Sequence, residues 1–250
     1  MRRTTLVLLA FVIGTVSAAV TGSLAMQYRN DAWHYTVTFP ANWVEIPRAE
    51  IDQATARLST QTGTKTSAAY IMGAQRAGAT YFTHPYALIS HQPIRGLTLR
   101  DLVEANSREG AATQKMKELT ARGFFSAFDL LDPAVARDRD AVVVPLSATT
   151  VEGVRVKALT VLFPCPQGVV QMHFYSTEAT VASDFEEFFQ AYQSLSFDKG
   201  HGYRPVGAFV QRVTDPSGKS SVIVAVIVGA ILAGLYKHQS NRKKTKLGRP

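Results

Sequence analysis

The sequence is poor in cysteine and in recognisable catalytic motifs. Cys165 is the only cysteine in 250 residues, which excludes the small secreted classes whose folds depend on several disulfides. The chain carries no GxSxG, P-loop, GxGxxG or HExxH pattern, so hydrolase, nucleotide-binding and zinc-protease signatures are missing. Residues 26–198 are numerous enough to form one domain with a real hydrophobic core, which must provide stability without disulfides.

The net charge of +8 comes from the flanks of two apolar segments. Arg2 and Arg3 precede the first segment. The second is followed by a basic tail without acidic residues, made of Lys237, Arg242, Lys243, Lys244, Lys246 and Arg249. The other 19 Lys and Arg are balanced by all 19 Asp and Glu. The charge therefore indicates membrane topology, and we expect no nucleic-acid partner.

The N-terminus has the three parts of a secretory signal peptide. A charged start is followed by the apolar run 6–16 and by small residues ending in Ala18 and Ala19. The run is too short to span a hydrocarbon core about 30 Å thick. The pattern predicts a signal peptide over residues 1–19, and an uncleaved signal anchor is the alternative.

A second apolar segment, residues 220–236, lies between Lys219 and Lys237 without a charge. It predicts a transmembrane helix about 25 Å long. The positive-inside rule keeps the basic tail, residues 237–250, in the cytoplasm and places residues 26–198 in the periplasm. Residues 199–219 are rich in Gly, Pro and polar residues and are predicted to be a linker. The predicted localisation is thus a single-pass membrane protein whose first partner is the lipid bilayer.

The predicted membrane helix has small residues at every fourth position: Ala225, Gly229 and Ala233. Such a stripe lets two helix backbones approach closely, so it suggests a homodimer or pairing with another membrane helix. The alternative is that these residues are simply the small residues common in membrane helices.

Strands and helices alternate through residues 26–198. Strands are predicted at 33–39, 67–75, 86–91, 141–150, 154–163 and 168–176. The strand 86–91 is bracketed by Pro85 and Pro93, which favours an edge position. Helices are predicted after Pro47, over 99–119 behind a Thr98/Asp101 capping box, and over 183–195, where Phe185, Phe188, Phe189, Tyr192 and Leu195 form one apolar face.

The first strand and its turn have the form Tyr-x-Val-x-Phe-Pro-x-x-Trp, from Tyr35 to Trp43. The strand 169–175, the helix 183–195 and the following Leu-Ser-Phe close the domain. This arrangement resembles the PsbP/Mog1-like α/β/α sandwich family, here in a bacterial membrane-anchored envelope protein. The resemblance implies an α+β fold, with helices on an antiparallel sheet of about six strands, and a binding or accessory role. It transfers no catalytic residue.

Chemistry-bearing side chains are dispersed. His34, His91 and His173 fall on predicted strands and could form a metal site only if the sheet brought them together. Surface or hydrogen-bonded histidines are the alternative, and neither a metal nor a cofactor is expected. Asp129 with Asp132, and Asp138 with Asp140, have spacing that is common in loops.

Two further features concern recognition. Cys165 stands between two prolines in a predicted turn, where an exposed thiol could form an intermolecular disulfide. The aromatic residues Tyr70, Tyr81, Phe82 and Tyr86 could form a binding surface or part of the core.

The sequence favours a non-enzymatic, membrane-anchored domain that binds a protein partner in the envelope. The alternative is an enzyme, or a receptor for a metal or small ligand, whose site is assembled from dispersed strand and loop residues.

Overall fold

The computed structural model describes residues 25–62, 70–78, 80–107, 110–121, 125–151 and 153–204. The strands are β1 (Gln27–Asn30), β2 (Tyr35–Thr38), β3 (Trp43–Ile46), β4 (Tyr70–Arg76), β5 (Tyr86–Gln92), β6 (Phe125–Leu130), β7 (Ala134–Ala136), β8 (Ala141–Thr150), β9 (Arg155–Cys165), β10 (Gly168–Thr177) and β11 (Ser196–Phe197). The helices are α1 (Arg48–Thr62), α2 (Leu99–Ala105), α3 (Ala111–Ala121) and α4 (Val181–Ser194), with a 3-10 turn η1 (Arg137–Arg139).

The strands form two antiparallel sheets. The main sheet has eight strands in the order β3-β4-β5-β10-β9-β8-β6, with β7 also paired to β8. The small sheet has three strands in the order β1-β2-β11. The antiparallel α+β class is confirmed, but the prediction of about six strands was too low. The short strands β3, β6 and β7 carry too few alternating apolar residues to stand out in the sequence.

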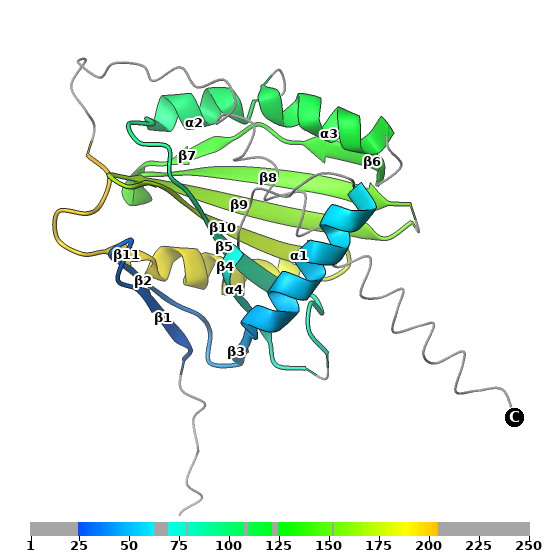
Figure 1. The fold of residues 1–250 in the computed structure, drawn as a ribbon, viewed down its shortest axis with the longest axis horizontal. Helices are drawn as coiled ribbons and strands as arrows, with labels where there is room; N and C mark the ends of the chain where they lie inside the picture. The colour runs from blue at the N-terminus through cyan, green and yellow to red at the C-terminus, as the bar shows by residue number, and fades with distance from the viewer. Residues whose placement is uncertain are drawn as a thin grey trace, which may run out of the picture.

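The main sheet separates two cores (Figure 1). On one face, α1, α2 and α3 bury Ile51, Leu102 and Met116 against the sheet. On the other face, α4 and the small sheet enclose a second core that includes Tyr35, Trp43 and Phe188. The result is the predicted order of layers, with helices on both sides of an antiparallel sheet.

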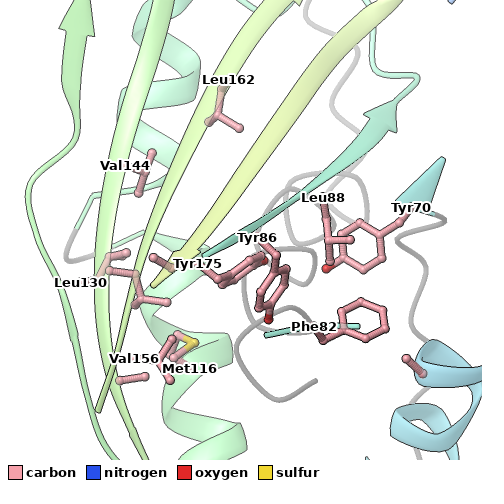
Figure 2. Close-up of a cluster of buried hydrophobic side chains, with 14 of the residues drawn as sticks. Tyr70, Phe82, Tyr86, Leu88, Met116, Leu130, Val144, Val156, Leu162 and Tyr175 are labelled. Carbon is pink, nitrogen blue, oxygen red and sulfur yellow. The ribbon is translucent and has the colours of Figure 1, made fainter. Parts of the chain in front are cut away.

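Most of the aromatic residues that could have formed a binding surface are buried in the core beneath α1–α3 (Figure 2). Tyr70, Phe82 and Tyr86 are all buried there. The Tyr86 ring stacks on that of Tyr175 with centroids 4.8 Å apart. These residues therefore belong to the core, and Tyr81 packs partly buried against them.

Two local predictions were wrong. Strand β5 is central, between β4 and β10, because its flanking prolines lie outside the paired residues and leave every N–H of the strand free to bond. The helix predicted over 99–119 is split into α2 and α3. The capping box at Thr98 forms as predicted, but Asn106 ends α2 by donating its side-chain amide to the carbonyl of Leu102 at 2.8 Å.

No helix in the described part of the chain is long and apolar enough to cross a membrane. The predicted signal peptide, the membrane helix with Ala225, Gly229 and Ala233, and the basic tail all lie outside the described residues.

Candidate functional site

The three candidate histidines do not meet. His91 on β5 and His173 on β10 point to opposite faces of the main sheet, since His91 pairs with Val170 whereas His173 pairs with Leu88. His34 lies in the turn between β1 and β2, where its ring stacks on that of His201 with centroids 3.7 Å apart. Among the described residues, no group of three or more His, Cys, Asp or Glu side chains could hold a metal ion.

His173 belongs to a buried chain of hydrogen bonds across three central strands. Its Nδ1 lies 3.0 Å from the Thr160 hydroxyl, and its Nε2 lies 3.0 Å from the Ser90 hydroxyl. The Ser90 hydroxyl donates to the side-chain carbonyl of Gln171 at 3.2 Å, so it must accept from His173. The proton therefore sits on Nε2, and Thr160 donates to Nδ1. Gln171 in turn donates to Gln92.

This arrangement makes His173 a structural residue. Burial of the ring lowers the pKa of His173 to about 3, so the imidazole is neutral. Both ring nitrogens are already bonded to hydroxyl groups, and the ring has no exposed surface. A buried polar chain that is fully paired fixes the register of β5, β9 and β10 but presents no base to a substrate.

His91 has a different structural role on the opposite face. The Tyr35 hydroxyl, whose pKa burial raises, lies within hydrogen-bond distance of Nε2 of His91 at 3.0 Å. The indole of Trp33 stacks on the imidazole with centroids 4.0 Å apart. Burial lowers the pKa of His91 to about 4. His91 is therefore neutral and joins the small sheet to the main sheet.

Cys165 is buried, contrary to the predicted exposure. It ends β9, is 7 % exposed and packs in the core beneath α4. Burial raises the pKa of its thiol, which lowers its reactivity. An intermolecular disulfide would first require this sulfur to be uncovered.

Helix α4 is held to the main sheet by a network of charged residues. Arg76 on β4 bonds Asp184 at 2.9 Å and Glu187 at 2.8 Å. Glu187 also accepts from the indole N–H of Trp43 at 2.6 Å. Asp184 is fully buried and accepts a second bond from Ser176. The tryptophan of the predicted Phe-Pro-x-x-Trp turn therefore fixes the position of the helix.

The predicted apolar face of α4 is divided into an inner and an outer part. Phe188, Tyr192 and Leu195 are buried against the sheet. Phe185 and Phe189, one helical turn apart, are 49 % and 39 % exposed, and their rings stack at 6.5 Å. We call these two phenylalanines, with the exposed Glu186 between them, the outer face of α4.

A pocket of about 430 Å³ opens near the C-terminal end of α4. Its walls come from three segments that are distant in the sequence: 138–140, 163–164 and 195–204. The Arg139 guanidinium spans two of these segments, because one of its terminal nitrogens donates to the carbonyl of Leu195. Residues 199–204, predicted to be linker, thus form part of the pocket wall.

The pocket combines charges of both signs with aromatic rings. Its cationic residues are Arg139, Lys199 and Arg204, and its carboxylates belong to Asp138, Asp140 and Asp198. Asp198 is already bound by Arg29 at 2.9 Å and 3.2 Å, and these hydrogen bonds lower the pKa of its carboxyl group. The aromatic rings are those of Phe163, Phe197 and Tyr203.

Comparison with solved structures shows the fold. The cyanobacterial PsbP protein CyanoP from Synechocystis sp. PCC 6803 has a TM-score of 0.50 and 11 % identity over 74 % of this chain and 99 % of its own. The Saccharomyces cerevisiae Ran-binding protein Mog1p has a TM-score of 0.38 and 8 % identity over 70 % of this chain and 96 % of its own. A point mutant of protein Mog1 has a TM-score of 0.40 with the same identity and coverage.

The fold is therefore PsbP/Mog1-like, as the residue pattern from Tyr35 to Trp43 suggested. No protein-family model matches the chain, and no curated protein matches it either. At these identities the likeness concerns the fold alone.

Sequence reasoning missed the pocket and the outer face of α4 for different reasons. The pocket depends on three segments that only the tertiary fold brings together. The outer face gave a partial signal, the helical spacing of its phenylalanines, but which of these rings stay exposed depends on how α4 packs on the sheet.

Proposed function

We propose that this protein is a membrane-anchored accessory domain that binds a protein partner in the bacterial envelope through the outer face of α4. The observation that carries the proposal is the stacked, solvent-exposed pair Phe185 and Phe189. Exposed large aromatic side chains that lie together are typical of interaction surfaces.

The helix is suited to present these rings because it cannot shift easily. Arg76 and Trp43 hold its buried side through Asp184 and Glu187. Phe188 fixes the same side within the core. Rigid presentation reduces the entropy that binding must overcome.

The charge around α4 favours a partner with basic residues. The helix carries the carboxylates of Asp184, Glu186 and Glu187 and no Lys or Arg. Arg76 supplies one guanidinium against these three carboxylates. We therefore expect the partner to present apolar side chains together with a Lys or Arg that lies opposite Glu186. A second copy is a poorer fit, since a symmetric contact would bring two Glu186 side chains together.

The membrane part of the proposal rests on the sequence. Residues 1–19 would direct export, 220–236 would span the bilayer, and 237–250 would stay in the cytoplasm. A reporter enzyme that is active only in the cytoplasm should be active when it is fused after Pro250. Protease added from the periplasmic side should digest residues 26–198. The opposite orientation would contradict this topology.

The partner is tested by crosslinking in cells that produce the full chain. A photoreactive amino acid at Gln190, which is exposed beside the phenylalanines, should give one discrete adduct. The same residue at Val151, exposed at the far end of the main sheet, is the matched control and should not give this adduct.

Three variants decide whether that adduct reports the proposed contact. Phe185→Ala with Phe189→Ala, and separately Glu186→Lys, should abolish it. When a basic residue of the captured protein is replaced by Glu, the Glu186→Lys variant should form the adduct again. An adduct that persists in all variants, or one that joins two copies of this chain, would contradict the proposal.

The pocket beside α4 favours a second candidate function, a receptor for a small ligand. Its walls are assembled from dispersed residues, and its volume of about 430 Å³ is within the usual size of small-molecule sites.

A further inference from the structure

We propose that the pocket between η1, the end of β9 and residues 195–204 binds a free amino acid with an apolar side chain. This inference concerns a different surface from the outer face of α4 and does not depend on the protein partner.

The cationic residues in the pocket wall suit a carboxylate. The Arg139 guanidinium is oriented by its bond to the carbonyl of Leu195, and its Nε has no hydrogen-bond partner among the described residues. Lys199 and Arg204 add two further positive charges to the wall. Arginine and lysine side chains that line one pocket commonly bind carboxylates.

The Arg204 side chain lies close to a glycine in the same turn. Gly200 has a φ of +89°, and a Cβ placed on it would lie 3.3 Å from a terminal nitrogen of Arg204. The guanidinium therefore lies over the turn, and the positive φ favours glycine at position 200. The turn brings this charge to the pocket wall.

The carboxylates in the pocket wall suit an ammonium group. Asp198 is neutralised by Arg29, which leaves Asp138 and Asp140 as the carboxylates without an ion pair in the described structure. Asp140 has a φ of +48°, so the end of η1 turns sharply where its side chain meets the pocket. A ligand that carries only a carboxylate would be repelled by the negative charges of these two aspartates.

The remaining wall is apolar. Phe163, Leu195 and Phe197 line it, and the first two are almost fully buried beneath the pocket surface. A pocket lined by cations, carboxylates and aromatic rings together matches a zwitterion that has an apolar side chain.

Three probes that each carry one phenyl group separate the contribution of the carboxylate to binding from that of the ammonium group. L-phenylalanine carries both charges, 3-phenylpropionate only the carboxylate, and phenethylamine only the ammonium. Binding to the full chain in detergent can be measured by ligand-observed NMR. We expect L-phenylalanine to bind with a dissociation constant of about 0.1–1 mM. Each single-charge probe should bind at least about tenfold more weakly, because part of the pocket charge is left unpaired.

Pocket variants should separate the same two contacts. Lys199→Gln with Arg204→Gln should weaken L-phenylalanine and 3-phenylpropionate but not phenethylamine. Asp138→Asn with Asp140→Asn should weaken L-phenylalanine and phenethylamine instead. Asparagine tolerates the positive φ at position 140, so this change should preserve the turn. All four replaced residues are exposed, and an unchanged melting temperature checks that folding is intact.

The matched control is Arg155→Gln, an exposed arginine paired with Glu178 outside the pocket, which should change none of the three affinities. Equal affinity for L-phenylalanine and 3-phenylpropionate would overturn the zwitterion assignment. Absence of binding up to roughly 10 mM, or equal loss in the Arg155→Gln control, would overturn the site itself.

Discussion

The two faces of the main sheet differ in how completely they are closed. Beneath α1–α3, polar groups such as His173 and Ser90 are fully buried and bonded to one another. Around α4, the helix buries Phe188 but exposes Phe185 and Phe189, and the pocket opens at its end. From this difference we propose that the α1–α3 face serves stability and that the binding surfaces lie on the α4 face.

The largest effect should come from the inner side of α4. Phe188→Ala removes a ring that packs against Phe174 and Trp43, with centroids 4.9 Å and 6.3 Å away. We expect the free energy of unfolding to fall by about 3–5 kcal/mol. Urea unfolding followed by the fluorescence of the buried Trp43 measures it. A loss below about 1 kcal/mol would show that the α4 core is loosely packed.

The next effect concerns the charged residues that hold α4. Arg76→Met leaves the buried Asp184 carboxylate without its guanidinium partner, although Ser176 still donates to it. Because Arg76 is 36 % exposed, we expect a loss of about 2–3 kcal/mol, less than for a fully buried pair. Asp184→Asn in the Arg76→Met background should recover part of that loss. No recovery would show that the buried charge is not the cause.

The α1–α3 face should make stability depend on pH. The pKa of His173 is about 3 in the folded chain and about 6.5 when unfolded, so the unfolded chain takes up the proton first as pH falls. The free energy of unfolding should therefore be highest above pH 6.5. It should fall by about 1.4 kcal/mol per pH unit from His173 as pH drops toward 3.

His91 acts in the same direction until pH reaches about 4. Urea unfolding at several pH values should show a shallower slope for His173→Gln than for the unchanged chain. Equal slopes would mean that the ring is protonated in the folded protein and that the assigned hydrogen bonds are wrong.

The smallest effect on stability should come from the outer face of α4. Phe185→Ala and Phe189→Ala remove exposed rings, so each should change the free energy of unfolding by about 0.5 kcal/mol or less. Thermal melting of both variants beside Phe188→Ala measures the contrast. A loss comparable to that of Phe188→Ala would assign the two rings to the core.

The sequence predicted the elements with strong periodicity and missed those that depend on tertiary contacts. The strands from Ala141 to Thr177 are long runs rich in apolar residues, separated by turn residues, and were predicted with nearly correct bounds. The short strand Ala134–Ala136 has no such pattern and pairs only because β8 lies beside it. The central position of β5 likewise depends on which strands fold against it.

The candidate site was predictable only in part. The aromatic residues of α4 were visible at helical spacing, but their division into buried and exposed rings depends on how α4 rests on β2 and β10. The burial of Cys165 follows from strand β9 continuing two residues past Phe163. The opposite faces of His91 and His173 follow from the strand register, which the sequence alone does not give.

The most direct test of the account compares stability and binding in one variant. The double variant Phe185→Ala, Phe189→Ala should keep its melting temperature within a few degrees of the unchanged chain. It should also lose the discrete crosslinked adduct formed from position 190. An adduct of undiminished yield in this stable variant would contradict the claim that the outer face of α4 is the binding surface.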